Sequence, residues 1–313
     1  MDTFKILVTG ANGFVGRALC PALRAQGHVV REAVRAEGGT DQVAVGEIDG
    51  QTDWSEALPE MEIVVHLAGR AHMTGDRAQA FSAYRRVNLE GTENLARQAA
   101  KRGVRRLVFV SSVKVNGEET HGRPFTEDDP SNPEDPYGIT KWEAEQALAE
   151  VAAETGLETT VLRPPLVHGP GVKGNLLRLL QGIQQNRPFP LGAVVNKRSL
   201  IGVDNLCSAL CLCVAHPATG TYLVSDSESI SSPELVRTLA KAMGRQVRQF
   251  AVPVPLMELA AKVIKRKSEF RRLTGSLEVD AGKIQREMGW SPSKSLHDGL
   301  NDMVRWYMDS CSN

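Results

Sequence analysis

Tyr137 and Lys141 have the types and the spacing for acid–base chemistry. Asp135 and Pro136 before them favour the start of a helix, because aspartate is a good cap and proline is tolerated in the first turn. On a helix, residues four apart lie one turn above each other, so the phenol and the ammonium share one face. A nearby cation lowers the pKa of a tyrosine from about 10, which would allow proton exchange near neutral pH. Such pairs also occur by chance, so the surrounding elements must decide.

The start of the chain predicts a site for a dinucleotide. An apolar run at residues 4–9 leads into a glycine-rich turn at 10–16, and residues 17–26 read as a helix. In such a strand–turn–helix unit the glycines let a pyrophosphate approach the backbone, and the helix N-terminus binds it. The turn residues expected to contact the cofactor are Gly10, Asn12, Gly13, Phe14, Val15 and Gly16.

The end of the second expected strand, residues 29–34, bears on which dinucleotide binds. An acid there would accept hydrogen bonds from the ribose hydroxyls of NAD. Here Arg35 follows the strand, and Glu32 comes two residues early. A guanidinium suits a 2′-phosphate, so we expect NADP(H) to be favoured, with NAD(H) as the other possibility. Arg35 could also be an ordinary surface arginine.

Further apolar runs at residues 63–67, 107–111 and 159–163 alternate with helical patterns at 76–88, 89–102 and after Asp135. This succession predicts an α/β fold with a doubly wound parallel (Rossmann) sheet, whose strands deliver polar residues to one edge. A proline- and glycine-rich crossing follows at 163–171. We expect a dinucleotide-binding domain at 1–168, to which 203–225 returns, and a substrate-binding domain at 169–202 and 226–313.

Composition excludes several classes of partner. The 313 residues hold 37 Lys+Arg and 37 Asp+Glu, so no excess charge points to nucleic acid. No apolar run approaches the roughly 18 residues of a membrane span, and no leader pattern is seen, so we expect a cytoplasmic protein without an integral membrane segment. The five cysteines lack paired ligands, and no metal site is expected.

Five motifs in order resemble the extended short-chain dehydrogenase/reductases, in particular the NAD-dependent epimerase/dehydratase group that acts on nucleotide sugars. They are the glycine turn and residues 67–69, 87–92, 111–117 and 137–141. The resemblance covers nearly the whole chain and implies a catalytic set of Ser112, Tyr137 and Lys141. In that family the serine holds the sugar oxygen and the tyrosine exchanges its proton. The lysine bonds the nicotinamide ribose and lowers the pKa of the tyrosine.

The resemblance also implies the remaining contacts and a smaller, mostly helical C-terminal substrate domain. The further cofactor contacts are Arg35, Glu47, Ile48, Leu67, Ala68, Gly69, Asn88, Tyr137, Lys141 and Pro164. The substrate contacts are Ser112, Val113, Asn175 and Arg198. Arg198 would bind the substrate phosphates, whereas Asn175 could instead be a simple helix cap. Family members also suggest a homodimer through helix 89–102 and the Tyr137 helix.

Departures from the family pattern narrow the chemistry. Where 4,6-dehydratases carry an Asp-Glu pair after the serine, this chain has Val113 and Lys114. Oxidation and reduction at one sugar carbon remain. Our leading hypothesis is an NADP(H)-linked 4-ketoreductase of a UDP-linked, N-acetylated 6-deoxyhexosamine for surface polysaccharide. The alternatives are a UDP-hexose or UDP-N-acetylhexosamine 4-epimerase with tightly held NAD, and a non-catalytic nucleotide-sensing protein.

Two smaller expectations concern the C-terminal part. Trp290 and Trp306 are expected to pack the small domain. Basic residues cluster at Lys262, Lys265, Arg266 and Lys267, with Arg271 and Arg272 following. Such a run is usually a solvated face, and a contribution to a phosphate-rich substrate or to an anionic membrane surface is the other possibility.

Overall fold

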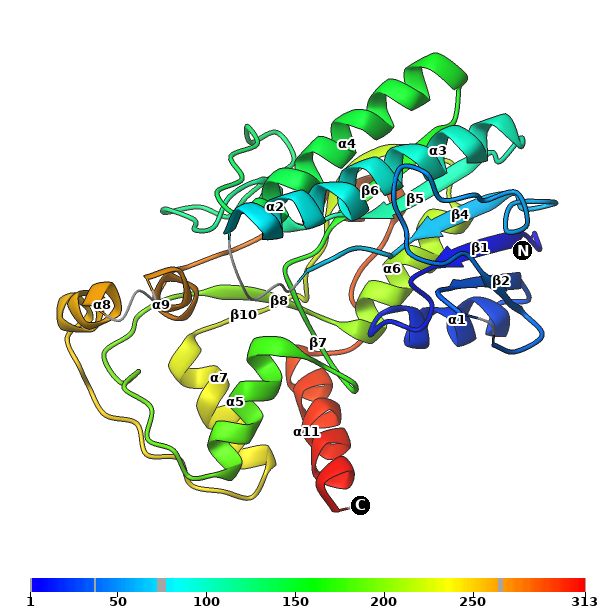
Figure 1. Ribbon diagram of the computed structural model, residues 1–313. Helices are drawn as coiled ribbons and strands as arrows, with labels where there is room; N and C mark the ends of the chain where they lie inside the picture. Colours follow the sequence, from blue (N-terminus) through cyan, green and yellow to red (C-terminus); the bar gives the residue numbers. More distant parts are fainter. Residues whose placement is uncertain (1, 37, 72–76, 264–266, 313) are drawn as a thin grey trace.

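A parallel sheet with helices on both faces forms the larger part of the computed structural model, which describes residues 2–36, 38–71, 77–263 and 267–312 (Figure 1). Within these residues the seven strands stand in the order β3-β2-β1-β4-β5-β6-β9, and all neighbours are parallel. The predicted α/β fold with a doubly wound sheet is confirmed. The strands are β1 Lys5–Thr9, β2 Val29–Val34, β3 Gln42–Ala44, β4 Ile63–His66, β5 Arg106–Val110, β6 Glu158–Arg163 and β9 Gly220–Leu223.

Each face of the sheet has its own apolar core. Side chains alternate along β1, so Ile6 and Val8 pack on one face and Leu7 packs on the other. The first face is covered by α1 (Gly16–Ala25) and α6 (Val203–Ala215), and the second by α2 (Arg77–Arg85), α3 (Gly91–Lys101) and α4 (Pro136–Thr155) (Figure 1). Burial on both faces explains why the central strands read as nearly continuous apolar runs.

Part of the C-terminal chain belongs to the first core. Helix α10 (Gly282–Met288) and the residues just after it place Ile284 and Trp290 in the first core. The indole N–H of Trp290 donates to the Ser208 hydroxyl at 2.9 Å. The prediction that Trp290 packs the small domain is therefore wrong, because α10 lies against β9 and α6 rather than among the C-terminal helices. Trp306 does pack against the C-terminal core.

The rest of the C-terminal part is mostly helical, with a small sheet in the order β10-β8-β7. Its strands are β7 Leu166–His168, β8 Arg198–Gly202 and β10 Ser229–Ile230. The expected crossing at 163–171 thus contains the short strand β7, which pairs with β8. The helices are α5 Gly174–Gln184, α7 Ser232–Ala242, α8 Val254–Val263, α9 Lys267–Thr274 and α11 Leu296–Ser312. The domain limits given above stay a prediction.

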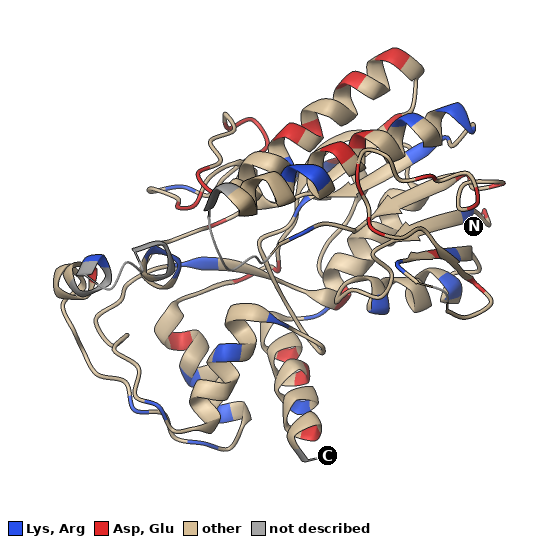
Figure 2. Cartoon of the chain, in the orientation of Figure 1, with Lys and Arg blue, Asp and Glu red and all other residues tan. Residues whose placement is uncertain are grey.

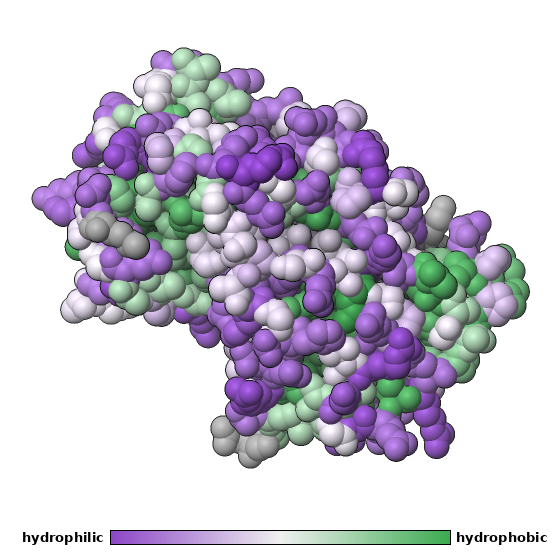
Figure 3. Space-filling model, turned by 180° about the vertical axis from the view of Figure 1, so that it is seen from behind, coloured by the Kyte–Doolittle hydropathy of each residue, from purple (hydrophilic) through white to green (hydrophobic). Residues whose placement is uncertain are grey.

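The surface is hydrophilic over much of the back view, with apolar residues gathered on a protrusion at one end (Figure 3). That end corresponds to α8, which Figure 1 places far from the seven-stranded sheet. None of the helices in the described part of the chain is both long and apolar enough to cross a bilayer. Asp76, Lys265 and Arg266, which the sequence placed in a helix or a basic cluster, lie outside the described residues.

Candidate active site

Tyr137 lies in the first turn of α4, as predicted from Asp135 and Pro136. The Asp135 carboxylate accepts the N–H of Gly138 at 2.7 Å, and Pro136 occupies the first helical position. The Tyr137 ring is half-buried and meets the Tyr84 ring edge-on, with centroids 6.2 Å apart. A helix cap therefore fixes the phenol at the carboxyl edge of the sheet.

Ser112, which follows β5, is brought to the same place. A hydrogen bond with Ser112 lowers the pKa of Tyr137, opposing other effects on that group. The Ser112 hydroxyl also accepts the backbone N–H of Lys114 at 3.3 Å, which holds the serine at the start of a short helical turn. Serine and tyrosine thus form a pair that could bind one hydroxyl or carbonyl oxygen between them.

The pKa of Tyr137 differs from the prediction. The pKa of Tyr137 is raised to about 12, first by burial and then by the charge of Asp135. Lys141 is only 3% exposed, and burial lowers its pKa to about 7. Its Nζ lies 4.0 Å from the centroid of the Phe109 ring. The expectation of a lowered tyrosine pKa is wrong for the protein by itself, because burial and the charge of Asp135 outweigh the hydrogen bond with Ser112.

Behind Lys141 runs a buried chain of polar groups. His66, at the end of β4, has Nδ1 2.6 Å from the Thr9 hydroxyl and Nε2 2.9 Å from the Thr92 hydroxyl. The Thr92 hydroxyl donates to the carbonyl of Asn88 at 2.7 Å. Burial lowers the pKa of His66 to about 3, so the ring is neutral. Sequence analysis missed this residue, although a lone polar side chain ending an apolar strand is a usable signal.

Asn88 connects the loop after β4 to the Tyr137 helix. It lies in a π-helical turn, Arg86–Glu90, a rare geometry that is frequent at functional sites. Its side chain accepts the N–H of Arg70 at 2.8 Å and donates to the Thr140 hydroxyl at 3.1 Å. A Cβ on Gly69 would lie 3.3 Å from Asn88 Oδ1 and 3.7 Å from Lys141 Nζ. Glycine at 69 therefore keeps room beside the lysine.

The glycine turn fits a dinucleotide in a similar way. Gly10 has φ +69°, and a Cβ there would lie 2.8 Å from the Ala68 nitrogen. A Cβ on Gly16 would lie 2.4 Å from the Gly10 oxygen. Only glycines allow β1, the turn and the loop after β4 to approach this closely. Phe14 packs against both the first core and the C-terminal core, so the turn also joins the two parts.

At the far end of this site, two predicted cofactor residues meet. Arg35 and Glu47 lie beyond β2 and β3, with Nε and Oε1 3.4 Å apart, and 75% of the arginine side chain is exposed. Glu32 instead forms an ion pair with Arg24 of α1 at 2.8 Å. Ile48 packs at the edge of the second core. The guanidinium at the end of β2 is therefore already opposed by a carboxylate.

The predicted substrate residues are spread over both parts. The Val113 side chain is 3% exposed and packs with Leu223, while its N–H donates to the Pro164 carbonyl at 3.0 Å. Asn175 is exposed inside α5, whose cap position is Lys173, so the interpretation of Asn175 as a helix cap is wrong. Of these two residues, only Asn175 has an exposed side chain.

Arg198 opens β8 and is held by a hydrogen bond from Nη1 to the Gly275 carbonyl at 3.0 Å. Burial lowers its pKa, and the charges of Glu118 and Arg272 also act on it. Arg272 binds Asp135 at 3.2 Å, so a cation from the C-terminal part reaches the start of the Tyr137 helix. These guanidinium groups suit a phosphate-bearing substrate.

Helix α9 is tied to the loops around α4 by ion pairs. Arg271 binds Glu119 at 3.0 Å and Glu134 at 2.8 Å. Acidic residues are frequent on these loops, whereas Figure 2 shows lysine and arginine on the facing segment. The interpretation of Arg271 and Arg272 as part of a solvated face is wrong. Lys114 is likewise held, by Glu118 at 2.7 Å and by Asp135.

The model for the NAD dependent epimerase/dehydratase family matches residues 6–224. The chain belongs to this family. It is 38% identical to a UDP-glucose 4-epimerase of Vibrio cholerae, over 98% of this chain and 96% of that protein. This family member is an NAD-dependent nucleotide-sugar modifying enzyme.

Two further comparisons extend the range of relatives. An Escherichia coli O157:H7 protein named N-acetyl-alpha-D-glucosaminyl-diphospho-ditrans,octacis-undecaprenol 4-epimerase is 26% identical over 96% of this chain and 95% of its own. The structure of a UDP-glucuronic acid 4-epimerase from Bacillus cereus, in complex with NAD, superposes with a TM-score of 0.80 at 20% identity. It covers 98% of this chain and 99% of that one, which supports the family fold.

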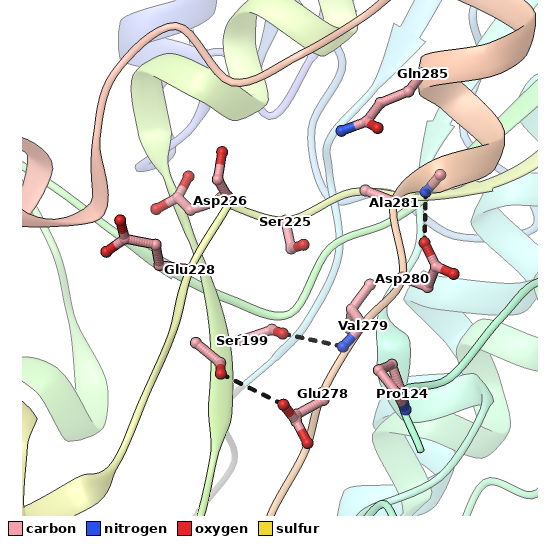
Figure 4. Close-up of a pocket in the computed structure, with 13 residues that line it drawn as sticks. Pro124, Ser199, Ser225, Asp226, Glu228, Glu278, Val279, Asp280, Ala281 and Gln285 are labelled. Atoms are coloured by element: carbon pink, nitrogen blue, oxygen red, sulfur yellow. Dashed lines mark hydrogen bonds between the residues drawn. The ribbon is translucent and has the colours of Figure 1, made fainter.

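This member of the family also has a pocket away from Tyr137, with a volume of about 300 Å³. Figure 4 shows Asp226, Glu228, Glu278 and Asp280 around it, with the Ser199 hydroxyl accepting the Val279 N–H at 3.0 Å. None of the predicted site residues lines it. Its carboxylates would repel a nucleotide diphosphate, so the cations near Arg198 are the better substrate contacts.

Proposed function

We propose that this protein is a 4-epimerase of a UDP-linked hexose or N-acetylhexosamine that keeps NAD bound through its cycle. The observation that carries this proposal over a 4-ketoreductase is the 38% identity, along almost the whole chain, with a UDP-glucose 4-epimerase. The acid–base groups agree with it. Val113 and Lys114 occupy the positions of the dehydratase acids, and Lys114 is engaged by two carboxylates.

The reaction needs one group that both removes and returns a proton, and Tyr137 would be that group. Its phenolate would take the proton of the C4 hydroxyl as the C4 hydrogen leaves as hydride. The resulting phenol would return the proton to the C4 oxygen when the ketone has presented its other face and the hydride comes back to C4. Ser112 holds the same oxygen. NAD, when bound, would supply the hydride acceptor and a positive ring whose charge lowers the pKa of Tyr137. Lys141 would hold the nicotinamide ribose beside Gly69 and Asn88.

The pairing of Arg35 with Glu47 supports NAD over NADP(H). A carboxylate 3.4 Å from the guanidinium reduces its attraction for a 2′-phosphate and can accept hydrogen bonds from a ribose. The preference for NADP(H) inferred from Arg35 stays a prediction. Arg35→Ala should leave NAD affinity nearly unchanged, whereas an enzyme that uses NADP(H) would lose affinity for that cofactor.

Purification without added cofactor separates the epimerase from the reductase. The epimerase should carry nicotinamide near one equivalent per chain, and it should interconvert UDP-glucose and UDP-galactose, or the N-acetylated pair, with no cofactor supplied. Nicotinamide release can be measured by chromatography after denaturation, and the products by NMR. Stoichiometric consumption of NADPH with a 4-keto substrate would overturn the epimerase and restore the reductase.

A lipid-linked sugar diphosphate is the second candidate substrate. The similarity to the E. coli O157:H7 epimerase over nearly the full chain favours it. The sugar and diphosphate of such a substrate would meet Ser112, Tyr137 and Arg198 in the same way as we propose for a UDP-sugar. Parallel assays with UDP-N-acetylglucosamine and with N-acetylglucosaminyl-diphospho-undecaprenol, both read as C4 epimers, would distinguish the two.

Substrate anchoring and assembly complete the proposal. Arg198 would bind the diphosphate, so Arg198→Lys should raise KM more than it lowers kcat, because lysine cannot reproduce the bidentate contact. Asn175 would contact the substrate from the first turn of α5. We also propose a homodimer through α3 and α4, which light scattering of the purified protein would test.

A further inference from the structure

Helix α8 and the loops at residues 187–197 and 244–253 expose apolar side chains together. We call this surface the α8 end. Leu256 and Leu259, one turn apart on α8, are 59% and 60% exposed. Val195 is 96% exposed and Phe250 48%. Figure 3 shows an apolar protrusion, rather than a hollow, at the end of the molecule where α8 lies.

The two loops are fixed to each other rather than loose. The Phe189 N–H donates to the Arg248 carbonyl at 2.9 Å, and the Phe250 N–H returns a bond to the Phe189 carbonyl at 3.2 Å. The Gly192 N–H donates to the Phe250 carbonyl at 3.0 Å. On α8 itself, Met257 packs inward against the C-terminal core. The outward positions of Leu256 and Phe250 therefore follow from an ordered scaffold.

Exposed cations lie on the same two loops and on the same helix as these apolar side chains. Arg187 and Arg248 lie on the two loops, and neither forms an ion pair with an acid in the described parts of the chain. Lys262 follows Leu259 on α8 and has only an exposed contact with Glu258 at 3.4 Å. Figure 2 shows the basic residues on the loops below α8. The loops thus carry exposed cations, and α8 carries one exposed ion pair beside its two exposed leucines.

We propose that the α8 end docks onto a bilayer of anionic phospholipid. Leucine and phenylalanine side chains on a convex tip can enter the boundary between headgroups and acyl chains, while lysine and arginine meet the phosphates. A stable protein partner would need about 800 Å² of complementary surface on each side, which favours a flatter patch than this protrusion. The proposal does not depend on which sugar is the substrate.

The α8 end is connected to the active site through helix α9. Helix α9 follows α8 in the chain and packs beside it. Arg272 of α9 binds Asp135, the residue that caps the Tyr137 helix. The contact with lipid would therefore set the orientation of the substrate side of the enzyme towards the bilayer.

Sedimentation of the full-length protein with vesicles tests the proposal. Binding should be strong to vesicles of phosphatidylcholine mixed with phosphatidylglycerol, weak to phosphatidylcholine alone, and reduced by salt. The double variant Leu256→Gln/Leu259→Gln should bind at least about tenfold more weakly, because two apolar side chains no longer leave water. The variant Arg187→Gln/Arg248→Gln should lose about fivefold for each cation on anionic vesicles only.

Val29→Gln is the matched control, because Val29 is an apolar residue that is 54% exposed at the start of β2, outside the α8 end. It should bind vesicles as the wild type does. Absence of wild-type binding, or equal binding by the leucine double variant, would overturn the proposal. A fall in molar mass of the leucine variant by light scattering, without any lipid binding, would assign the surface to a second copy of the chain instead.

Discussion

Around Lys141, polar groups are buried and tied to partners, whereas at the α8 end leucines are exposed and arginines lack acidic partners among the described residues. His66 is fully buried with both ring nitrogens engaged, while Leu259 is 60% exposed. Burying a polar group is costly unless it is hydrogen-bonded, and an exposed leucine lacks the favourable free energy that burial would contribute. The first region meets the rule for buried polar groups, whereas the second departs from the rule for leucine. The first builds one fixed geometry, and the second is suited to a partner that the chain does not contain.

Removing the phenol oxygen of Tyr137 should have the largest effect on the buried region. Tyr137→Phe should lower kcat by roughly 10²–10⁴, the usual range for a lost acid–base group, with the thermal midpoint little changed. Steady-state assays of C4 epimerisation measure this. Tyr84→Phe is the matched control on the neighbouring ring and should retain most activity. Near-normal turnover by Tyr137→Phe would contradict the assigned role.

A buried ion pair supports the same helix. Arg163 of β6 is 4% exposed and binds Glu145 of α4, 7% exposed, at 2.6 Å. Arg163→Met should lower the free energy of unfolding by about 3–5 kcal/mol, because Glu145 would remain buried and unpaired. Urea denaturation measures the loss.

The exposed pair Lys262–Glu258 on α8 provides the contrast. Lys262→Met should change the unfolding free energy by less than about 1 kcal/mol, since exposed pairs contribute little. For the buried pair, the double variant Arg163→Met/Glu145→Leu should recover much of the unfolding free energy that Arg163→Met loses, because no buried charge remains unpaired. Equal effects of Arg163→Met and Lys262→Met would break the distinction between the two regions.

The neutral His66 predicts a pH dependence. Its pKa is about 3 in the folded protein and about 6.5 in an unfolded chain, so only the unfolded chain takes up a proton between these values. The stability contributed by neutral His66 is complete above pH 6.5 and is lost on acidification, by up to about 1.4 kcal/mol per pH unit. The unfolding free energy of His66→Gln should therefore fall less steeply from pH 6.5 to 5. Parallel curves for wild type and variant would contradict this.

The smallest effect is expected at the α8 end. Leu259→Gln should change the free energy of unfolding by less than about 0.5 kcal/mol, because the side chain is already in water. Leu148→Ala, in the second core, should cost about 2–5 kcal/mol. Thermal and urea denaturation of the two variants, compared side by side, measure the difference. A large loss for Leu259→Gln would mean that α8 is packed more tightly than its exposure indicates.

Local sequence predicted the elements that carry the site. The glycine turn, the apolar strand runs and Asp135 before Pro136 act over a few residues, and the structure confirms the strands, the helix start and the sheet. The resemblance to the family implied that Ser112 lies beside Tyr137, and the hydrogen bond between the two agrees with it. The strand β7 was missed because a strand of three residues between prolines and glycines is too short to show an alternation of apolar and polar side chains.

Only the tertiary structure decided the electrostatics and the contacts between distant segments. Asp135 is both the cap and a negative charge beside Tyr137, and burial turns the expected lowering of the phenol pKa into a rise. Arg271 pairs with acids more than a hundred residues away in the chain, and Trp290 joins the first core. Desolvation and ion pairing depend on what packs around a group. The sequence therefore determined which residues meet at the edge of the sheet, and the packing of distant segments determined their charge.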